Sequence, residues 1–296
     1  MKCLIYPDVD LWNYVLRGVE DDSVVLRPLN RFCNPLQLIL RKYLRAIALP
    51  LGLYVNRRLR ADVEALRSGD SLIVGDYTDM TLLTALSKSV KEDVKCYLWI
   101  WNPIKGAYRE WFACNVEKIK RLGYTICTFD PKDAEAFGLQ LMNQFFDMRC
   151  AADSSQELRW DCYFIGYAKD RRAEIEKMQQ QLSGLRTNFV VVEKPSDAIP
   201  YARNMENVAA SRALVDIVQG EQSGLTLRPL EALACRKKLI TNNVAIKGCD
   251  FYSPKNVFIV GEDDIATIGQ FVESEYCPVA ESIVERYDVN SWLGQF

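Results

Sequence analysis

The chain has 296 residues, with 37 lysines and arginines, 39 aspartates and glutamates, a net charge of −2 and no histidine. Its composition is that of an ordinary globular protein, and its length suffices for two domains of usual size. The lack of histidine excludes Ser-His and Cys-His nucleophilic catalysis. The ten cysteines include no Cys-x-x-Cys pair, so we expect no zinc site and predict buried thiols in a reducing cytosol.

The chain begins with a predicted strand, because Cys3–Tyr6 is a short apolar run. No signal peptide precedes this run, and no apolar stretch is long enough to span a bilayer. We therefore expect a cytoplasmic protein.

The segment 27–67 is both basic and apolar. It contains nine arginines and lysines against two acidic residues, so its net charge is +7 in a chain of net charge −2. We expect helices here, broken around Leu49–Gly52. A basic amphipathic surface can lie on anionic lipid, which would place the protein at the inner face of the plasma membrane. A helix packed on a sheet with a solvated basic face gives the same pattern, and both interpretations stay open. No nucleic-acid motif accompanies the charges, so nucleic acid is not an expected partner.

A fully apolar run at Ser71–Gly75 is typical of a strand inside a parallel sheet. Asp76 and Asp79 follow it, at the edge where open α/β sheets place their ligands. Either carboxylate is a candidate general base on an acceptor hydroxyl if the reaction is inverting. An aspartate before a helix is also a common N-cap, and this is the favoured interpretation of Asp79.

The domain organisation follows from the alternation of apolar runs and helical patterns, which continues through Phe129. Residues 150–160 are polar and suit a linker, and a new strand is predicted from Asp161. We predict an α/β fold of two Rossmann-like domains facing a central cleft, with domain limits of 1–152 and 153–296.

A strand, loop, helix, strand unit is predicted between Ala213 and Asn243. Its loop lies where a strand end meets a helix N-terminus, and free N–H groups there favour phosphate. Glycine allows close backbone approach, hydroxyls can donate, and arginine adds a forked cation. Every doubly wound α/β protein contains such a unit, and Glu231 would then be an acid that complements the helix dipole. The candidate donor-binding residues of the loop are Ser223, Gly224, Leu225, Thr226 and Arg228.

The run GLTLRPLEALACRKKLITNN, which ends at Asn243, resembles the nucleotide-sugar loop of GT-B glycosyltransferases. The usual form of that loop is Glu-x-x-Gly, a few residues, then Glu-Ala-x-Ala-Cys-x-Lys and a strand. The whole run is more closely similar to a branch of bacterial lipopolysaccharide and capsular polysaccharide glycosyltransferases.

The resemblance implies roles for individual residues. The second glutamate of the motif, here Glu231, usually binds the ribose of the nucleotide. The first glutamate is Glu221, a candidate catalytic residue; nine residues separate the two, and the stereochemical outcome stays open. The first strand of a GT-B C-terminal domain ends in a loop facing the donor phosphates, which assigns Gly166, Lys169 and Arg172 to the diphosphate. The last helix, within 289–296, would return to the N-terminal domain.

The function implied is that of a hexosyltransferase-type glycosyltransferase. It would move a sugar from a nucleotide-sugar donor to a lipid-linked or lipopolysaccharide-type glycan acceptor. The donor is a substrate, so no cofactor is expected, and no Asp-x-Asp motif stands at a strand end, so we expect metal independence. Two other classes stay open: a different nucleotide-sugar enzyme such as an epimerase, and a non-catalytic nucleotide- or glycan-binding partner of another enzyme.

Overall fold

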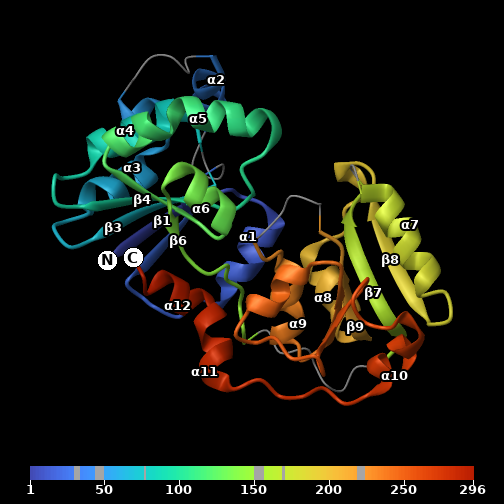
Figure 1. Cartoon of the computed structure of the whole chain (residues 1–296). Coiled ribbons are helices and arrows are strands. Elements are labelled where there is room, and N and C mark those ends of the chain that lie inside the picture. Colours follow the sequence, from blue (N-terminus) through green and yellow to red (C-terminus); the bar gives the residue numbers. More distant parts are fainter. Residues whose placement is uncertain (30–33, 44–49, 77, 150–156, 169–170, 219–223) are drawn as a thin grey trace. The chain divides into compact units, whose positions relative to one another are not determined.

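The computed structural model describes residues 1–29, 34–43, 50–76, 78–149, 157–168, 171–218 and 224–296 (Figure 1). The chain forms two compact units. Unit 1 contains residues 1–13, 19–143 and 293–296, and unit 2 contains residues 14–18 and 144–292.

Unit 1 is built on a parallel sheet of six strands in the order β2-β1-β3-β4-β5-β6. The central strands are apolar on both faces, as parallel strands covered by helices must be; all five residues of β3 are buried. The strands are β1 (Lys2–Tyr6), β2 (Val24–Pro28), β3 (Ser71–Gly75), β4 (Lys95–Ile100), β5 (Tyr124–Thr128) and β6 (Gln140–Leu141).

Helices α3, α4 and α5 of unit 1 pack their apolar faces on this sheet. Leu82 of α4 and Phe112 and Ile119 of α5 are fully buried in one core with Leu72 and Leu98 of the strands. The helices are α2 (Pro35–Tyr43), η3 (Leu51–Leu53), α3 (Arg57–Ala65), α4 (Met80–Ser89), α5 (Gly106–Arg121) and α6 (Pro131–Phe137), while α1 (Asp10–Val15) spans the division between the units.

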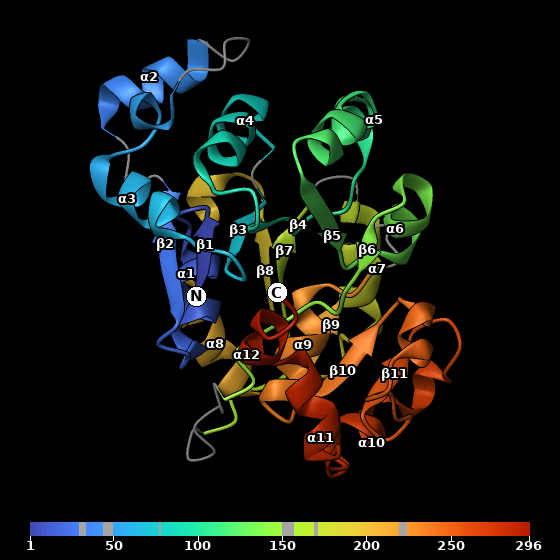
Figure 2. The ribbon, with the colours of Figure 1, turned by 90° about the vertical axis from the view of Figure 1, so that its left-hand side faces the viewer.

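Unit 2 is built on a parallel sheet of five strands in the order β11-β10-β9-β7-β8 (Figure 2). Its strands are β7 (Trp160–Tyr167), β8 (Thr187–Val192), β9 (Ser211–Asp216), β10 (Lys238–Thr241) and β11 (Val257–Ile259). Its helices are α7 (Arg172–Gln181), α8 (Tyr201–Ala209), α9 (Leu227–Ala234), α10 (Ile268–Glu273) and α11 (Glu281–Val284). The last helix, α12 (Val289–Leu293), belongs to unit 2 except for Leu293.

The two sheets share one topology. In unit 1 the first strand, β1, lies between β2 and β3, and in unit 2 the first strand, β7, lies between β8 and β9. The strand order therefore reverses beside β1 and beside β7. In open parallel sheets such a switch point leaves a crevice at the carboxyl ends of the two strands, where ligands bind. The α/β class predicted from the sequence is confirmed, and each sheet has a Rossmann-like topology.

The chain ends within unit 1. Lys2 Nζ donates to the carbonyl of Leu293 at 2.7 Å, and Ser71 Oγ donates to that of Phe296 at 2.7 Å. Trp292, the residue before Leu293, stacks on Phe145 of unit 2 with ring centroids 3.8 Å apart. In the part of the chain that is described, no helix is long and apolar enough to cross a bilayer.

Candidate functional site

The carboxyl ends of β7 and β9 meet at the switch point of unit 2, and Arg171 bridges them. Its Nε donates to the Tyr167 carbonyl at 3.0 Å, and its Nη1 donates to the carbonyl of Ile217, the residue after β9. Lys169, which the sequence also assigned to this loop, lies outside the described residues.

Gly166 makes room for that arginine. A Cβ at Gly166 would lie 2.5 Å from Arg171 Nη2 and 3.0 Å from the ring of Phe164. Both distances are shorter than a carbon can sustain without displacing its neighbours. Glycine at this position therefore permits the guanidinium to lie against the end of β7.

Arg172, the neighbour of Arg171, forms a surface ion pair instead. Its guanidinium pairs with Glu193, and both side chains are about half exposed. The sequence pattern selected Arg172 as the diphosphate ligand, but the residue that lies over the strand ends is Arg171. The sequence feature that could have indicated Arg171 is a pair of basic residues at the start of a helix that follows a strand. This feature does not show which of the two residues lies over the strand ends.

Arg228, in the first turn of α9, supplies a second guanidinium at this edge. Its Nη1 pairs with Glu231 Oε2, and its Nη2 lies 3.4 Å from the carbonyl of Ile165 on β7. The guanidinium carbon is 5.8 Å from the ring centroid of Tyr163. The side chain is 11% exposed, so its position is set by unit 2 itself.

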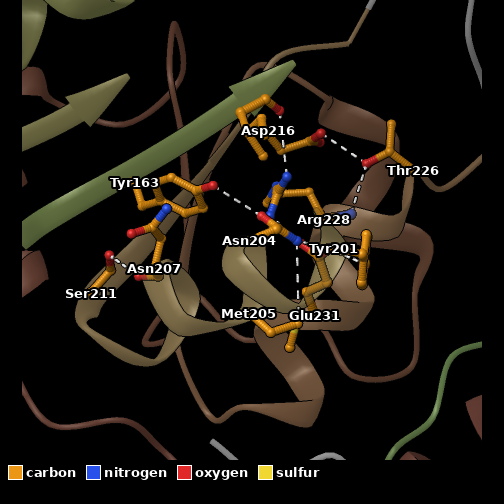
Figure 3. Close-up of polar contacts among 11 residues, drawn as sticks. Tyr163, Tyr201, Asn204, Met205, Asn207, Ser211, Asp216, Thr226, Arg228 and Glu231 are labelled. Carbon is orange, nitrogen blue, oxygen red and sulfur yellow. Dashed lines mark hydrogen bonds and ion pairs between the residues drawn. The ribbon is translucent and has the colours of Figure 1, made fainter. Parts of the chain in front are cut away.

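Glu231 lies one turn later on α9 (Figure 3), and its side chain is 2% exposed. Oε1 accepts hydrogen bonds from the Tyr201 hydroxyl and from Asn204 Nδ2, the latter at 3.0 Å, while Oε2 accepts from Arg228. Asn204 Oδ1 in turn accepts from the Tyr163 hydroxyl at 3.1 Å. Both carboxylate oxygens of Glu231, the residue predicted to bind ribose, are thus engaged within unit 2, and Oε2 orients Arg228.

The last residue of β9, Asp216, is a buried carboxyl that the sequence pattern did not single out. It accepts hydrogen bonds from Thr226 Oγ1 at 2.8 Å and from Thr241 Oγ1 at 3.0 Å. Burial raises the pKa of Asp216, and the two threonine hydroxyls and the nearby arginines oppose that rise. Thr226 Oγ1 also accepts from the backbone N–H of Arg228 at 3.3 Å and so caps α9. The predicted donor-binding hydroxyl of Thr226 therefore has a structural role in joining β9 to α9.

The N-terminus of α9 completes this edge. Gly224 and Leu225 lead directly into the helix, whose N-terminus carries the positive end of the helix dipole. In its first three residues the N–H of Arg228 is donated to Thr226 and Pro229 has no N–H, so Leu227 carries the remaining backbone N–H of this turn. Glu221 and Ser223 lie outside the described residues.

Asn243, two residues beyond β10, was also missed by the sequence pattern. Its side chain is buried, and among the described residues its Nδ2 has no hydrogen-bond partner. A buried amide donor without a partner is uncommon. The sequence feature that could have indicated Asn243 is an Asn-Asn pair directly after a buried strand.

In unit 1, Asp76 follows β3 at the other switch point. Its φ of 52° is in the left-handed region, which is uncommon for aspartate and marks local strain. Its Oδ1 accepts from the backbone N–H of Trp101 at 3.3 Å, and its Oδ2 accepts from Asn102 Nδ2 at 2.9 Å. Burial raises the pKa of Asp76 to about 6, although these hydrogen bonds lower it. The carboxyl group can therefore exchange a proton near neutral pH.

Asp79 is the N-cap of α4. Its Oδ1 accepts from the backbone N–H groups of Thr81 and Leu82 at 3.0 and 3.3 Å. The capping interpretation is thus the one that the structure shows, and Asp76 is the better candidate for a base. Among the described residues no group of three or more histidine, cysteine, aspartate or glutamate side chains could hold a metal ion.

Comparison with protein-family models finds no match, and comparison with curated proteins finds no significant match. Among solved structures, the chain is similar to the N-terminal domain of trehalose-6-phosphate phosphatase from Candida albicans. The superposition covers 97% of this chain and 91% of that one, with a TM-score of 0.50 and 11% sequence identity. At this identity the likeness shows the fold alone, and it supports a generic α/β architecture.

Proposed function

We propose that this chain is a GT-B glycosyltransferase of the hexosyltransferase type. It would bind a nucleotide-sugar donor on unit 2 and a lipid-linked or lipopolysaccharide- or capsule-type glycan acceptor on unit 1, and it would need no metal. The observation that carries the proposal is the convergence of Arg171, Arg228 and the N-terminus of α9 on the carboxyl ends of β7 and β9.

These groups suit a diphosphate. Two guanidinium groups can form charge-assisted hydrogen bonds to phosphate oxygens, and N–H groups at a helix N-terminus bind anions through the helix dipole. Both arginines are held by protein carbonyls, so little reorganisation would accompany the build-up of charge on the leaving diphosphate. Fixed cations of this kind can neutralise the leaving group without a divalent ion.

Asp76 supports an inverting reaction. With a pKa raised to about 6 by burial, its carboxyl group is mainly ionised at neutral pH and can accept the proton of an acceptor hydroxyl. Its strained backbone is also characteristic of residues held for a functional purpose. In this proposal the general base belongs to unit 1, and the groups that stabilise the leaving diphosphate belong to unit 2.

One observation favours a second candidate function. Because the carboxylate of Glu231 is enclosed by Tyr201, Asn204 and Arg228, it can reach a ribose hydroxyl only if one of these contacts is broken. A non-catalytic partner that binds a nucleotide or glycan would keep Arg171 and Arg228 at the strand ends, but it would not need a contact between Glu231 and ribose. An epimerase would act on the donor alone.

The decisive experiment measures the binding of UDP, GDP, CMP and TDP by thermal shift and by calorimetry. A ligand that binds only the folded chain raises its melting temperature. We expect one nucleotide to bind, and Arg171→Gln to weaken that binding about tenfold or more through loss of a charge-assisted hydrogen bond. The control is Arg172→Gln, which removes a neighbouring cation that pairs with Glu193 on the surface, and it should leave the affinity within about twofold.

Turnover then separates the function classes. If the matching nucleotide sugar is consumed only when a glycan acceptor is present, the chain is a transferase. If the donor is converted when no acceptor is present, the chain is an epimerase. Nucleotide binding without any turnover supports the non-catalytic partner. If none of the four nucleotides binds, the proposed donor site is wrong.

A further inference from the structure

Helix α2 exposes three of its apolar side chains. Leu36, Ile39 and Tyr43 are 64%, 51% and 71% exposed, and their spacing of three and four residues places them on one face of the helix. Leu53 on η3 is a further exposed apolar side chain at 43%. In both ribbon views α2 lies at the outside of unit 1, away from the strands (Figures 1 and 2). A surface helix normally turns such a face toward the core, so this arrangement requires an explanation.

A polar residue holds α2 in this orientation. Gln37 is buried, and its Nε2 donates to the carbonyls of Gly52 at 3.2 Å and Val55 at 2.6 Å. Asn34 and Gln37 also form a reciprocal capping box, with N···O distances of 2.9 and 2.8 Å between each backbone nitrogen and the other side chain. The inward face of α2 is therefore anchored by hydrogen bonds, and the outward direction of Leu36 and Ile39 is a consequence of that anchor.

The sequence around this face is strongly basic. The segment 27–67 carries a net charge of +7, so the remainder of the chain, at −9, is acidic. Arg57, Arg58 and Arg60, in the first turn of α3 close after η3, are exposed. Glu64 pairs with Arg60, and Asp62 pairs with Arg27, which accounts for both acidic residues of the segment.

We propose that the α2 face, defined as Leu36, Ile39 and Tyr43 of α2 with Leu53 of η3, docks on an anionic lipid surface, and that the exposed arginines of α3 add to the attraction. Short apolar helices with cationic surroundings lie in the headgroup region of membranes, where a tyrosine ring is also favoured. A specific protein interface needs about 20–30 residues on each side, far more than this narrow stripe offers. The acidic remainder of the chain would be repelled by the same lipid, which restricts contact to this segment.

The test is co-sedimentation of the full chain with vesicles of phosphatidylcholine alone and of phosphatidylcholine mixed with phosphatidylglycerol, without any nucleotide or glycan. We expect binding to the mixed vesicles at about 0.1 M salt and its loss at higher salt, because screening weakens the attraction. Leu36→Gln with Ile39→Gln should reduce the fraction bound about tenfold or more. Arg57→Gln with Arg58→Gln should reduce binding to the mixed vesicles while leaving the apolar stripe intact.

The matched control is Leu141→Gln, which removes a leucine of unit 1 that is 53% exposed outside the α2 face and should leave vesicle binding unchanged. Circular dichroism melting establishes that each variant is folded; exposed positions are expected to tolerate these changes. If the wild type sediments with neither vesicle, or if the Leu36 and Ile39 variant binds as the wild type does, lipid docking is refuted. A dimer seen by light scattering that this variant abolishes would identify a second copy as the occupant and would equally overturn the proposal. These outcomes do not depend on nucleotide binding, so they are independent of the proposed transferase activity.

Discussion

Replacement of Glu231 by alanine tests the central polar network of unit 2. The substitution removes the acceptor of Tyr201 and Asn204 and leaves the guanidinium of Arg228 without its carboxylate. Glu231 is almost fully buried and Arg228 is 11% exposed. Loss of one partner of a buried ion pair costs about 3–5 kcal/mol of unfolding free energy, because the other charge stays in a poorly solvated site.

The assay is urea unfolding followed by tryptophan fluorescence and by far-ultraviolet circular dichroism, with the midpoint as the readout. We expect Glu231→Ala to lower the midpoint strongly, and Arg228→Met combined with Glu231→Leu to restore part of the loss, since no buried charge is then left without a partner. Arg172→Ala breaks the exposed pair with Glu193 and should cost at most about 1 kcal/mol.

The alternative is that Glu231 is an accessible ligand for ribose. In that case Glu231→Ala would cost less than about 1 kcal/mol of stability, as for other exposed side chains, while abolishing nucleotide binding. That combination of results would refute the structural role of the network.

Four further predictions concern residues at or just after the strand ends. The pKa of Asp76 is raised from 3.8 to about 6 in the folded chain, so the protonated carboxyl group stabilises the fold fully at pH values below 3.8. This contribution, about 3 kcal/mol, is lost as the pH rises through about 6. Urea midpoints of the wild type and of Asp76→Asn, compared across this pH range, measure the loss, and parallel pH profiles would contradict it. If Asp76 is the base, acceptor-dependent turnover should rise with pH through about 6 and be absent in Asp76→Asn. Asp79→Ala should cost about 1 kcal/mol through loss of the α4 cap and keep turnover; loss of turnover in a folded variant would instead make Asp79 catalytic. Gly166→Ala should displace the Arg171 guanidinium, since the added Cβ would lie 2.5 Å from Nη2. We expect nucleotide binding, measured by calorimetry, to weaken about tenfold. An unchanged affinity would exclude Arg171 from the binding site.

The strands and their parallel arrangement could be predicted because a strand buried on both faces must be apolar along its whole length. The run Ser71–Gly75 became β3, and the two apolar runs around the Gly224 loop became β9 and β10. The same periodicity placed Asp76 and Arg228 at the carboxyl edge of a sheet, since these residues follow a strand or open a helix directly.

The choice between adjacent residues could not be predicted in this way. Arg171 and Arg172 are chemically identical neighbours, and the former points inward because the carbonyl of Ile217, 46 residues away, accepts its hydrogen bond. Glu231 is likewise enclosed by Tyr201 and Asn204, which belong to another helix. Contacts between distant segments carry no local period, so a sequence pattern does not contain them.

What the sequence alone determined is the α/β class, the succession of strands and helices, and the position of α9 between β9 and β10, because each depends on the order of apolar and polar residues along a short stretch. What only the tertiary structure decided is which side chains occupy the strand ends and which face of α2 meets solvent. The buried Gln37, with its hydrogen bonds to Gly52 and Val55, turns Leu36 and Ile39 outward. That orientation rests on contacts 15 and 18 residues apart, which the helical period by itself does not specify.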